Sequence, residues 1–392
     1  MDRFYERAKR DQQYHTEILE HLHRNPEISF EEIETTRFIQ NKLDEYGIEQ
    51  IPLGMKTGAV GIIRTGKPGK TILLRADIDA LKIMEDPSLD VVSRVPGVMH
   101  ACGHDFHTAC VLGAAKYFSE LRDQLTGNIV FLFQPAEEIT EGMQAMLNAG
   151  LLDRLPSAVD MVFSLHTYDS PLGTVVVNPY QIFGGKINFM LRIKGKIGHG
   201  ALPHRNIDPI VAAAAIITAT QTIVSRNTDP ADEMICSFCS VNTHGQDYFP
   251  SDEVVMSGSI RALSRDVMHF GLQRLRDIAT HVAAAHQCEC NLECCPEVPP
   301  CINHPAALKY ARAAAADIFE PNHILTIRPM LASDDFGILC NMFPSCYFFL
   351  GIRSEDNASQ LLHTPTYHTN RDALPYGISI LMQATMLALQ DN

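Results

Sequence analysis

The hydrophobic positions of the chain follow two different patterns, and each pattern predicts a different kind of domain. Over most of the chain, short runs of apolar and β-branched residues alternate with stretches in which apolar residues recur every three or four positions. Such runs are typical of buried strands and such stretches of helices, so this part predicts an α/β sheet with helices around it. The strands predicted for the sheet are 59–63, 71–74, 127–133, 161–165, 175–177 and 344–350. The helices predicted around it are 2–24, 30–46, 108–120, 141–149, 306–319 and 375–389.

Residues 184–298 show the second pattern. Apolar and polar residues alternate along the predicted strands, which indicates a sheet with one exposed face. Two predicted helices, 209–224 and 267–285, separate these strands in the order strand–helix–strand–strand–helix–strand, which is typical of a ferredoxin-like α+β sandwich. Because the first pattern resumes after this segment, we predict a discontinuous domain of residues 1–183 and 299–392 with residues 184–298 as an inserted domain.

The composition favours a globular protein without a nucleic-acid partner. The chain has 392 residues, of which 46% are hydrophobic and 20% charged, and a formal net charge of −14 at pH 7. This length suggests two domains, and the chain has no basic run that could bind phosphates. The N-terminus lacks the apolar stretch of a signal peptide, and no window approaches the length of a membrane span. The 11 cysteines are not spaced like a disulfide framework, so we expect free thiols or ligands in a cytoplasmic protein that binds no membrane.

The densest candidate chemistry lies in residues 99–109, which hold one thiol, three imidazoles and a carboxylate. Cys102 and His104 flank Gly103, whose backbone can bend freely, so both side chains can reach one metal ion. Clustered Cys and His residues can also be ordinary buried side chains. The segment by itself therefore allows both interpretations.

Three predicted strands end in further side chains that could bind a metal ion or act as a base. In an α/β sheet such strand ends lie where these folds place their sites. The residues are Asp77 and Asp79, Glu137 and Glu138, and His166. Taken singly, each also has a structural interpretation, because the two glutamates could begin a solvated helix and His166 could be a core histidine. Their joint occurrence at strand ends favours a functional site.

A ligand set for two metal ions can be assembled from these residues and one more histidine. Its members are Cys102, His104, Glu138, His166 and His363. Five such groups could hold two ions if one group bridges, and ions about 3.5–4 Å apart can share a water, lower its pKa and polarise a carbonyl. Glu137 would point away from Glu138 on an extended segment, which makes it a candidate general base. Thiolate and imidazole suit Zn²⁺, Ni²⁺ or Co²⁺, and the carboxylate also allows Mn²⁺.

Several dense motifs occur in order along the chain. They are residues 22–27, 75–81, 99–109, 134–138, 164–166, 198–204, 208–210, 258–261 and 362–365. Together they resemble the metallopeptidase family that holds the aminoacylases and their dipeptidase and carboxypeptidase relatives. Within it they are most similar to the amidohydrolase branch of hippurate hydrolases, N-acyl-amino-acid deacylases and plant indoleacetyl-amino-acid hydrolases. The resemblance covers roughly residues 15 to 385.

The resemblance implies a mixed-sheet, metallo-aminopeptidase-like catalytic domain whose insertion serves as a lid and a dimerisation domain. It also implies two divalent ions per subunit, with Cys102 as the bridging ligand. The other four ligands would divide into two pairs: Glu138 with His363, and His104 with His166. Glu137 would be the general base.

Further roles that the resemblance implies fall on residues outside the ligand set. Asp77 stands where related enzymes keep a metal-facing Asp, but Arg75 replaces their His, so we expect Asp77 to support the ligands. We expect the same of His107, three residues after His104. His199 resembles the lid-domain histidine that reaches the scissile carbonyl in the partner subunit's site. There it would stabilise the oxyanion, which implies a homodimer.

The chain also departs from the family pattern at several positions. Asp247 stands where the family usually has an Asn near the carboxylate of the substrate, so a different head group is one interpretation. Asp334 replaces the usual Glu, and Lys82 stands where Pro is common. Arg261 matches a family arginine, which could pair with the carboxylate of the substrate or form a structural ion pair.

These observations predict a metal-dependent hydrolase that acts on a small-molecule substrate. It would cleave N-acyl or N-aroyl amino acids to a carboxylic acid and a free amino acid. A dipeptidase or an N-carbamoyl amino acid hydrolase would use the same metals with a different pocket. A catalytically inactive relative would bind the metals without turnover.

Overall fold

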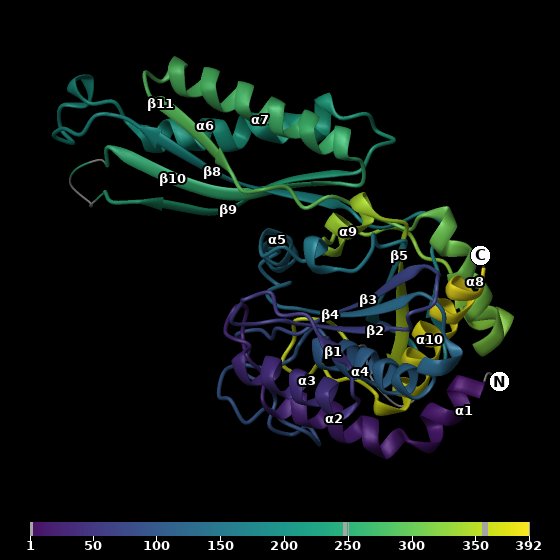
Figure 1. Cartoon of the computed structure of the whole chain (residues 1–392). Helices are drawn as coiled ribbons and strands as arrows, with labels where there is room; N and C mark the ends of the chain where they lie inside the picture. The colour runs from purple at the N-terminus through teal and green to yellow at the C-terminus, as the bar shows by residue number, and fades with distance from the viewer. Residues whose placement is uncertain (1–2, 246–248, 250, 355–359, 392) are drawn as a thin grey trace. The chain divides into compact units, whose positions relative to one another are not determined.

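The computed structural model describes residues 3–245, 249, 251–354 and 360–391, and it divides into two compact units (Figure 1). The first unit consists of Met1–Tyr180, Ile302–Arg328 and Asp334–Asn392. The second consists of Gln181–Cys301 and Pro329–Ser333. The short segment Pro329–Ser333 thus groups with the second unit, although the sequence pattern places it in the larger domain. Each unit has a hydrophobic core of its own.

The first unit is built on an eight-stranded sheet with the strand order β1-β2-β4-β3-β5-β14-β6-β13. Its strands are β1 (Glu49–Gln50), β2 (Ala59–Arg64), β3 (Thr71–Asp77), β4 (Asn128–Gln134), β5 (Met161–Pro171), β6 (Val175–Val176), β13 (Ile324–Leu325) and β14 (Ser345–Arg353). The central strands β4, β3, β5 and β14 run parallel, whereas β2 pairs with β4 and β6 with β14 in the antiparallel direction. The mixed α/β fold that the sequence predicts is confirmed.

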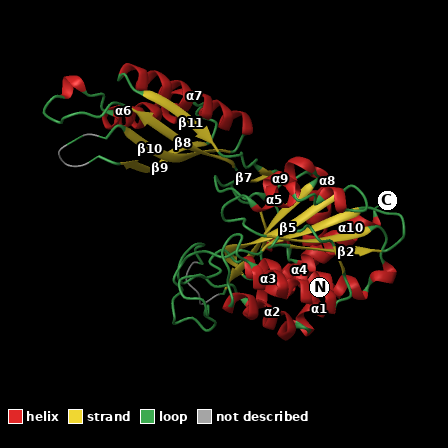
Figure 2. Cartoon of the chain, turned by 60° about the vertical axis from the view of Figure 1, so that its left-hand side comes forward, coloured by secondary structure: helices red, strands yellow, loops and turns green. Residues whose placement is uncertain are grey.

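Helices cover both faces of this sheet (Figures 1 and 2). They are α1 (Arg3–Arg10), α2 (Gln12–Arg24), α3 (Ile33–Glu45), α4 (His104–Glu120), α5 (Gly142–Asn148), α8 (Pro305–Ile318), α9 (Phe336–Met342) and α10 (Leu374–Gln390). Helices α4 and α10 pack on β3 and β5, and α1 and α2 pack against them in turn. Helices α5 and α9 contact each other on the opposite face (Figure 2). Single 3-10 turns lie at Arg122–Gln124, Leu152–Arg154, Pro321–His323 and Arg371–Ala373.

Helix α4 begins four residues earlier than the apolar pattern predicts. The pattern starts at Thr108, but the helix starts at His104, directly after Gly103. Gly103 has φ of 84°, a left-handed conformation that glycine adopts without strain and that ends the extended segment before the helix. A Cβ atom there would also meet the hydroxyl groups of Thr167 and Tyr367 at 2.6 Å. The consequence is that His104 and His107 lie on the rigid first turn of a buried helix.

The second unit contains a four-stranded antiparallel sheet in the order β11-β8-β10-β9. Its elements in chain order are β8 (Gly185–Lys194), α6 (Pro209–Thr222), β9 (Met234–Thr243), β10 (Glu253–Ala262), α7 (Arg265–Ala285) and β11 (Glu289–Cys294). Strand β8 buries every second residue, as the alternating pattern predicts. A 3-10 turn (Pro203–Arg205) precedes α6, and a π-helical turn (Ile223–Asn227) follows it. Strands β7 (Gln181–Phe183) and β12 (Cys301–Ile302) form a separate ladder.

Within the described part of the chain, two helical stretches are long and apolar enough to cross a membrane, by length and composition alone. They are Pro209–Asn227 and Arg371–Gln390. The sequence-based expectation that no stretch reaches this length is therefore wrong by that criterion. The second stretch is 78% buried over its most apolar window, as expected of a core helix in a globular unit.

Candidate metal centre

The carboxyl ends of the central parallel strands bring the candidate side chains together in the first unit. Strand β3 ends at Asp77, which is paired in register with Gln134 at the end of β4. Glu137 and Glu138 follow β4 within four residues, and His166 lies on the neighbouring strand β5. Parallel strands place their carboxyl ends at the same edge of a sheet. Residues that are far apart in the sequence therefore meet at this edge.

Five groups of three potential ligands form at this edge among the described residues, and two of them contain Cys102. One consists of Cys102, His104 and His166, and the other of Cys102, Glu138 and His363. In each group the ligand atoms lie within 4.8 Å of one another. His363 comes from the far end of the chain, and its backbone N–H donates to the carbonyl of Ala101 at 2.8 Å. The five residues predicted as ligands are thus neighbours.

The histidines of these groups are oriented by hydrogen bonds on their outer ring nitrogens. His104 Nδ1 lies 2.9 Å from the carbonyl oxygen of Asp79, and His166 Nδ1 lies 2.8 Å from that of Thr167. Because a carbonyl only accepts, each Nδ1 carries a proton and each Nε2 faces the candidate ligands, where that of His166 lies 3.5 Å from Cys102 Sγ. His104 Nε2 and Glu138 Oε1 are buried and have no hydrogen-bond partner among the described residues. A cation would satisfy both atoms, so the donor set fits a metal ion.

The pKa values of two candidate ligands are raised, and a bound cation would lower them. Burial and the neighbouring Glu138 raise the pKa of the Cys102 thiol well above its usual value. Burial raises the pKa of the Glu138 carboxyl to about 7. A bound dication reverses such shifts, since it stabilises the thiolate and the carboxylate directly.

His107 supports the ligands and is not itself free to bind a metal. The backbone N–H of Thr167 donates to His107 Nε2 at 3.0 Å, so the proton of the ring is on Nδ1. That proton is donated to Asp77 Oδ1 at 2.6 Å. The other oxygen, Asp77 Oδ2, accepts from Arg75 at 2.7 Å and lies 3.7 Å from His104 Nε2. Asp77 therefore faces the ligand cluster while both of its oxygens are already hydrogen-bonded.

Arg75 connects this layer to a second acidic segment. Its side chain is fully buried, and all five N–H groups have acceptors. Nε donates to Gln134, one terminal nitrogen to Asp77 and Asp334, and the other to Asp334 and Asp335. The guanidinium thus neutralises part of a buried acidic cluster and fixes its geometry.

Glu137 lies on the other side of that acidic cluster. Its carboxylate is within 4.8 Å of those of Asp334 and Asp335, and all three residues are buried. Burial, followed by the charge of Asp334, raises the pKa of Glu137 well above its usual value. Glu137 Oε2 also lies 3.9 Å from His104 Nε2. A carboxyl whose pKa is raised in this way, beside a candidate metal-ligand cluster, is a candidate general acid and base.

The remaining predicted residues lie in the second unit or outside the described part. His199 is exposed in the second unit, and its Nδ1 accepts from the N–H of Ala201 at 3.0 Å. Arg261 lies on β10 and donates to the carbonyl of Leu331 at 3.1 Å and to Ser333 at 3.3 Å. These contacts involve a carbonyl and a hydroxyl, not a carboxylate. Asp247 lies outside the described residues.

Several residues at the site were not predicted from the sequence. In the sequence, Asp334 stands out only as a departure from the family motif. The structure places Asp334 and Asp335 beside Glu137. Glu32, 104 residues before its partner Ala136, reaches the loop that carries Glu137. His23 bridges Asp105 and Glu85 at 2.7 and 2.8 Å behind the ligand helix. In the sequence, His23 is marked only by its position in residues 22–27, the first of the family motifs.

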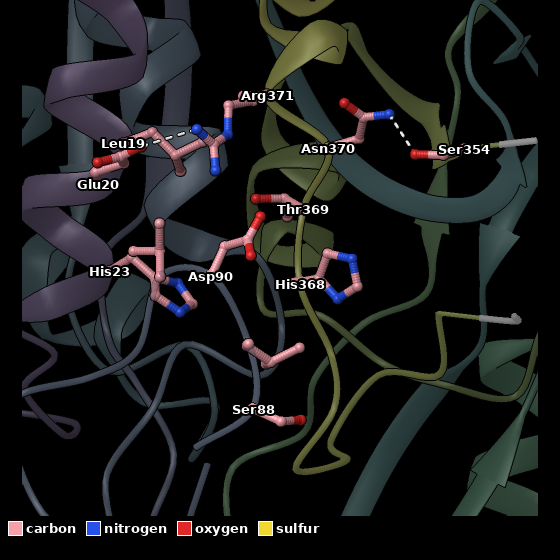
Figure 3. A pocket seen from close by; sticks show the side chains of 12 residues that line it. Leu19, Glu20, His23, Ser88, Asp90, Ser354, His368, Thr369, Asn370 and Arg371 are labelled. Carbon is pink, nitrogen blue, oxygen red and sulfur yellow. Dashed lines mark hydrogen bonds and ion pairs between the residues drawn. The ribbon is translucent and has the colours of Figure 1, made fainter. Parts of the chain in front are cut away.

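A cavity of about 380 Å³ opens in the first unit beside α2, but it is not lined by the predicted ligands (Figure 3). Glu20 and Arg371 pair at its edge at 3.2 Å, and Asn370 donates to Ser354 at 2.8 Å (Figure 3). Its link to the metal-ligand cluster is His23, which lines the cavity and binds Asp105 beside His104.

Comparisons with known proteins agree with this geometry. The model of the family described as Peptidase family M20/M25/M40 matches residues 73–386. IAA-amino acid hydrolase ILR1-like 2 of Arabidopsis thaliana is 34% identical over 365 residues, which cover 92% of this chain and 81% of that protein. Hippurate hydrolase of Campylobacter jejuni is 34% identical over 358 residues, which cover 90% and 91%. The crystal structure of the YXEP protein of Bacillus subtilis, described as a dinuclear metal binding peptidase from the M20 family, matches with a TM-score of 0.83 and 29% identity, covering 98% of this chain and 100% of that one.

Proposed function

The chain belongs to peptidase family M20/M25/M40, which confirms the resemblance carried by its motifs, and we propose that it is a dinuclear metal-dependent hydrolase of N-acyl amino acids. It would cleave the amide bond to release a carboxylic acid and a free amino acid. The names of two relatives, an IAA-amino acid hydrolase and a hippurate hydrolase, support this substrate class.

The observation that carries the proposal is that Cys102 belongs to both ligand groups. In the proposed site its thiolate would be a ligand of both divalent ions. The other ligands divide between the ions in two pairs: His104 with His166, and Glu138 with His363. Thiolate, imidazole and carboxylate together suit Zn²⁺, Co²⁺, Ni²⁺ or Mn²⁺.

When bound, the two ions would lower the pKa of an attacking water and polarise the scissile carbonyl. Glu137 accepts the proton of that water and then donates it to the nitrogen of the leaving amino acid. Burial of Glu137, and after it the neighbouring Asp334 and Asp335, raise its pKa and favour its protonated form, which suits the second of these steps. Arg75, Asp77 and His107 hold the ligand helix in place.

The second unit would complete the site as a lid. We propose that His199 stabilises the oxyanion, acting on the partner subunit of a cytoplasmic homodimer. Arg261 and Asp247 would contact the head group of the substrate. The exposed position of His199 leaves its Nε2 available for such a contact.

The test combines metal analysis with a substrate screen. The purified protein should contain two divalent ions per chain by inductively coupled plasma mass spectrometry, and it should hydrolyse N-benzoylglycine or N-acetyl amino acids. Glu137→Gln should keep both ions and lose turnover by at least about 10²-fold, since general acid–base catalysis contributes that much or more. The exposed Glu141, at the start of α5, provides the matched control Glu141→Gln. Near wild-type turnover in metal-loaded Glu137→Gln would contradict the proposal.

The same screen separates the alternatives. Faster turnover of dipeptides than of N-acyl amino acids would favour a dipeptidase, and faster turnover of N-carbamoyl amino acids would favour an N-carbamoyl hydrolase. A full metal complement with no hydrolysis of any of the three classes would favour an inactive metal-binding relative.

A further inference from the structure

Glu32 is a buried acidic side chain that the proposed chemistry does not use. It precedes α3, its side chain is inaccessible to solvent, and its Oε1 accepts from the backbone N–H of Ala136 at 2.8 Å. Its other oxygen, Oε2, is buried and has no hydrogen-bond partner among the residues that the structure describes. A carboxylate in such a place has a high desolvation cost, and burial raises its pKa to about 7. The hydrogen bond to Ala136 therefore forms in spite of the free-energy cost of desolvating the Glu32 carboxylate.

The partner of Glu32 lies at a strained point of the backbone. Ala136 has φ of 54° and Thr140 has φ of 58°, both in the left-handed region that non-glycine residues rarely adopt. Such a conformation is unfavourable for a residue with a Cβ, because the Cβ comes too close to the following carbonyl oxygen. Glu137 and Glu138 lie between these two residues. The loop must be held from outside to remain in this shape.

The two glutamates of this loop are not held in the same way. The backbone N–H of Glu138 donates to Asp79 Oδ2 at 3.0 Å, so Glu138 has an anchor of its own. The direction of Glu137 instead follows from the turn at Ala136, whose N–H is bound by Glu32. Glu137 lies beside Asp334 and Asp335, and Glu138 beside Cys102 and His363, while both carboxyl groups also approach His104 Nε2.

The segment that carries Glu32 is itself fixed to the site. The N–H of Ala80 donates to the carbonyl of Glu27 at 2.8 Å, directly after Asp79 at the end of β3. The carboxylate of Glu27 accepts from the N–H groups of Glu34 and Thr35, which begins helix α3. Glu32 thus extends from a turn that is tied to the same strand end as the ligands.

We propose that Glu32 is a positioning residue, whose carboxylate fixes the left-handed turn at Ala136 and thereby the direction of Glu137. The inference rests on the proposed function, because Glu137 is the proposed base. A neutral acceptor of the same length, as in Glu32→Gln, can make the same hydrogen bond. A shorter side chain cannot reach it.

The test compares four variants in the full-length, metal-loaded protein. Glu32→Ala and Glu32→Asp should each lower kcat on the order of 10- to 100-fold, with KM within about twofold, since a small misplacement of a catalytic group has effects of this size. Glu32→Gln should recover most of kcat. The exposed neighbour Glu31 supplies the matched control Glu31→Ala. Metal content should remain at the wild-type level in all four, because Glu138 is anchored through Asp79.

A second measurement distinguishes a failure of this inference from a failure of the proposed function. Hydrogen exchange of the backbone in residues 135–142 should be faster in Glu32→Asp and Glu32→Ala than in wild type, and unchanged in Glu32→Gln. This measurement does not depend on turnover. If the wild type hydrolysed no N-acyl amino acid, that result would refute the proposed function and leave the positioning role of Glu32 to be tested by exchange. Glu32→Asp keeps the charge and serves if Glu32→Ala does not fold. Wild-type kcat and exchange in Glu32→Asp, or a joint loss of metal and kcat, would overturn the inference.

Discussion

Arg75→Met should destabilise the protein by about 3–5 kcal/mol, because it removes one partner of a buried ionic cluster. The guanidinium makes hydrogen bonds of 2.7–3.3 Å to three aspartates and to Gln134, and its side chain is 0% exposed. Met has a similar volume, so the loss comes from the uncompensated carboxylates and not from a cavity. Domains are typically stable by about 5–15 kcal/mol, so such a loss is large.

Urea unfolding followed by circular dichroism measures this effect, with Arg64→Met as the matched control. Arg64 pairs with Glu49 at 2.9 Å, but the two side chains are 38% and 54% exposed. An exposed pair of this kind contributes about 0–1 kcal/mol. If Arg75→Met and Arg64→Met shift the midpoint equally, the buried cluster is not held by Arg75 and the reasoning fails. Arg75→Lys should lie between the two, since it keeps the charge but not the five donors.

Three further predictions concern the metal ions and the helix behind them. Metal analysis should show that Cys102→Ala loses both ions together. The control Cys110→Ala, which removes a buried thiol further along α4, should keep both ions. Retention of one full ion by Cys102→Ala would contradict a bridging role. Removal of the metals by a chelator should lower the midpoint of thermal unfolding in wild type but not in Cys102→Ala, because a ligand that binds the folded state stabilises it by mass action. Burial alone would lower the pKa of His23, but hydrogen bonds to Asp105 and Glu85 raise it from 6.5 to about 10. The difference in stability between wild type and His23→Gln should therefore be constant below about pH 6.5 and decrease as the pH rises toward 10. A difference that is constant up to pH 10 would refute the raised pKa.

The sequence predicts the sheet and its strand ends because both depend on local patterns. Apolar runs mark β3, β4 and β5, and a parallel sheet brings their carboxyl ends together whatever the length of the connections. The motifs then supply His363, whose connection to Ala101 no periodicity could reveal. The α/β fold, and the candidate side chains that the structure brings together at one edge of the sheet, are thus predictable from the sequence.

The residues that surround Glu137 could not be predicted from the sequence in the same way. Asp335 approaches Gln134 across 201 positions, and Glu32 approaches Ala136 across 104. Single polar contacts of this kind leave no periodic pattern, because they depend on side-chain directions at the ends of elements. The left-handed turn at Ala136 is also invisible, since neither Gly nor Asn marks it. What the sequence could not predict is the part that orients the proposed base.

Burial, followed by the charges of neighbouring carboxylates, explains why Glu137 and Glu138 have raised pKa values. Arg75 is the cation that the acidic segment contacts, and it faces Asp77, Asp334 and Asp335. Glu137 and Glu138 instead approach His104 Nε2 at 3.9 and 4.0 Å, on the side where its lone pair lies. Buried carboxylates in such proximity must share protons or a cation. The crowding of negative charge, which adds to the effect of burial on the pKa values of Glu137 and Glu138, would also favour a dication, because a dication stabilises the ionised forms of the same carboxyl groups.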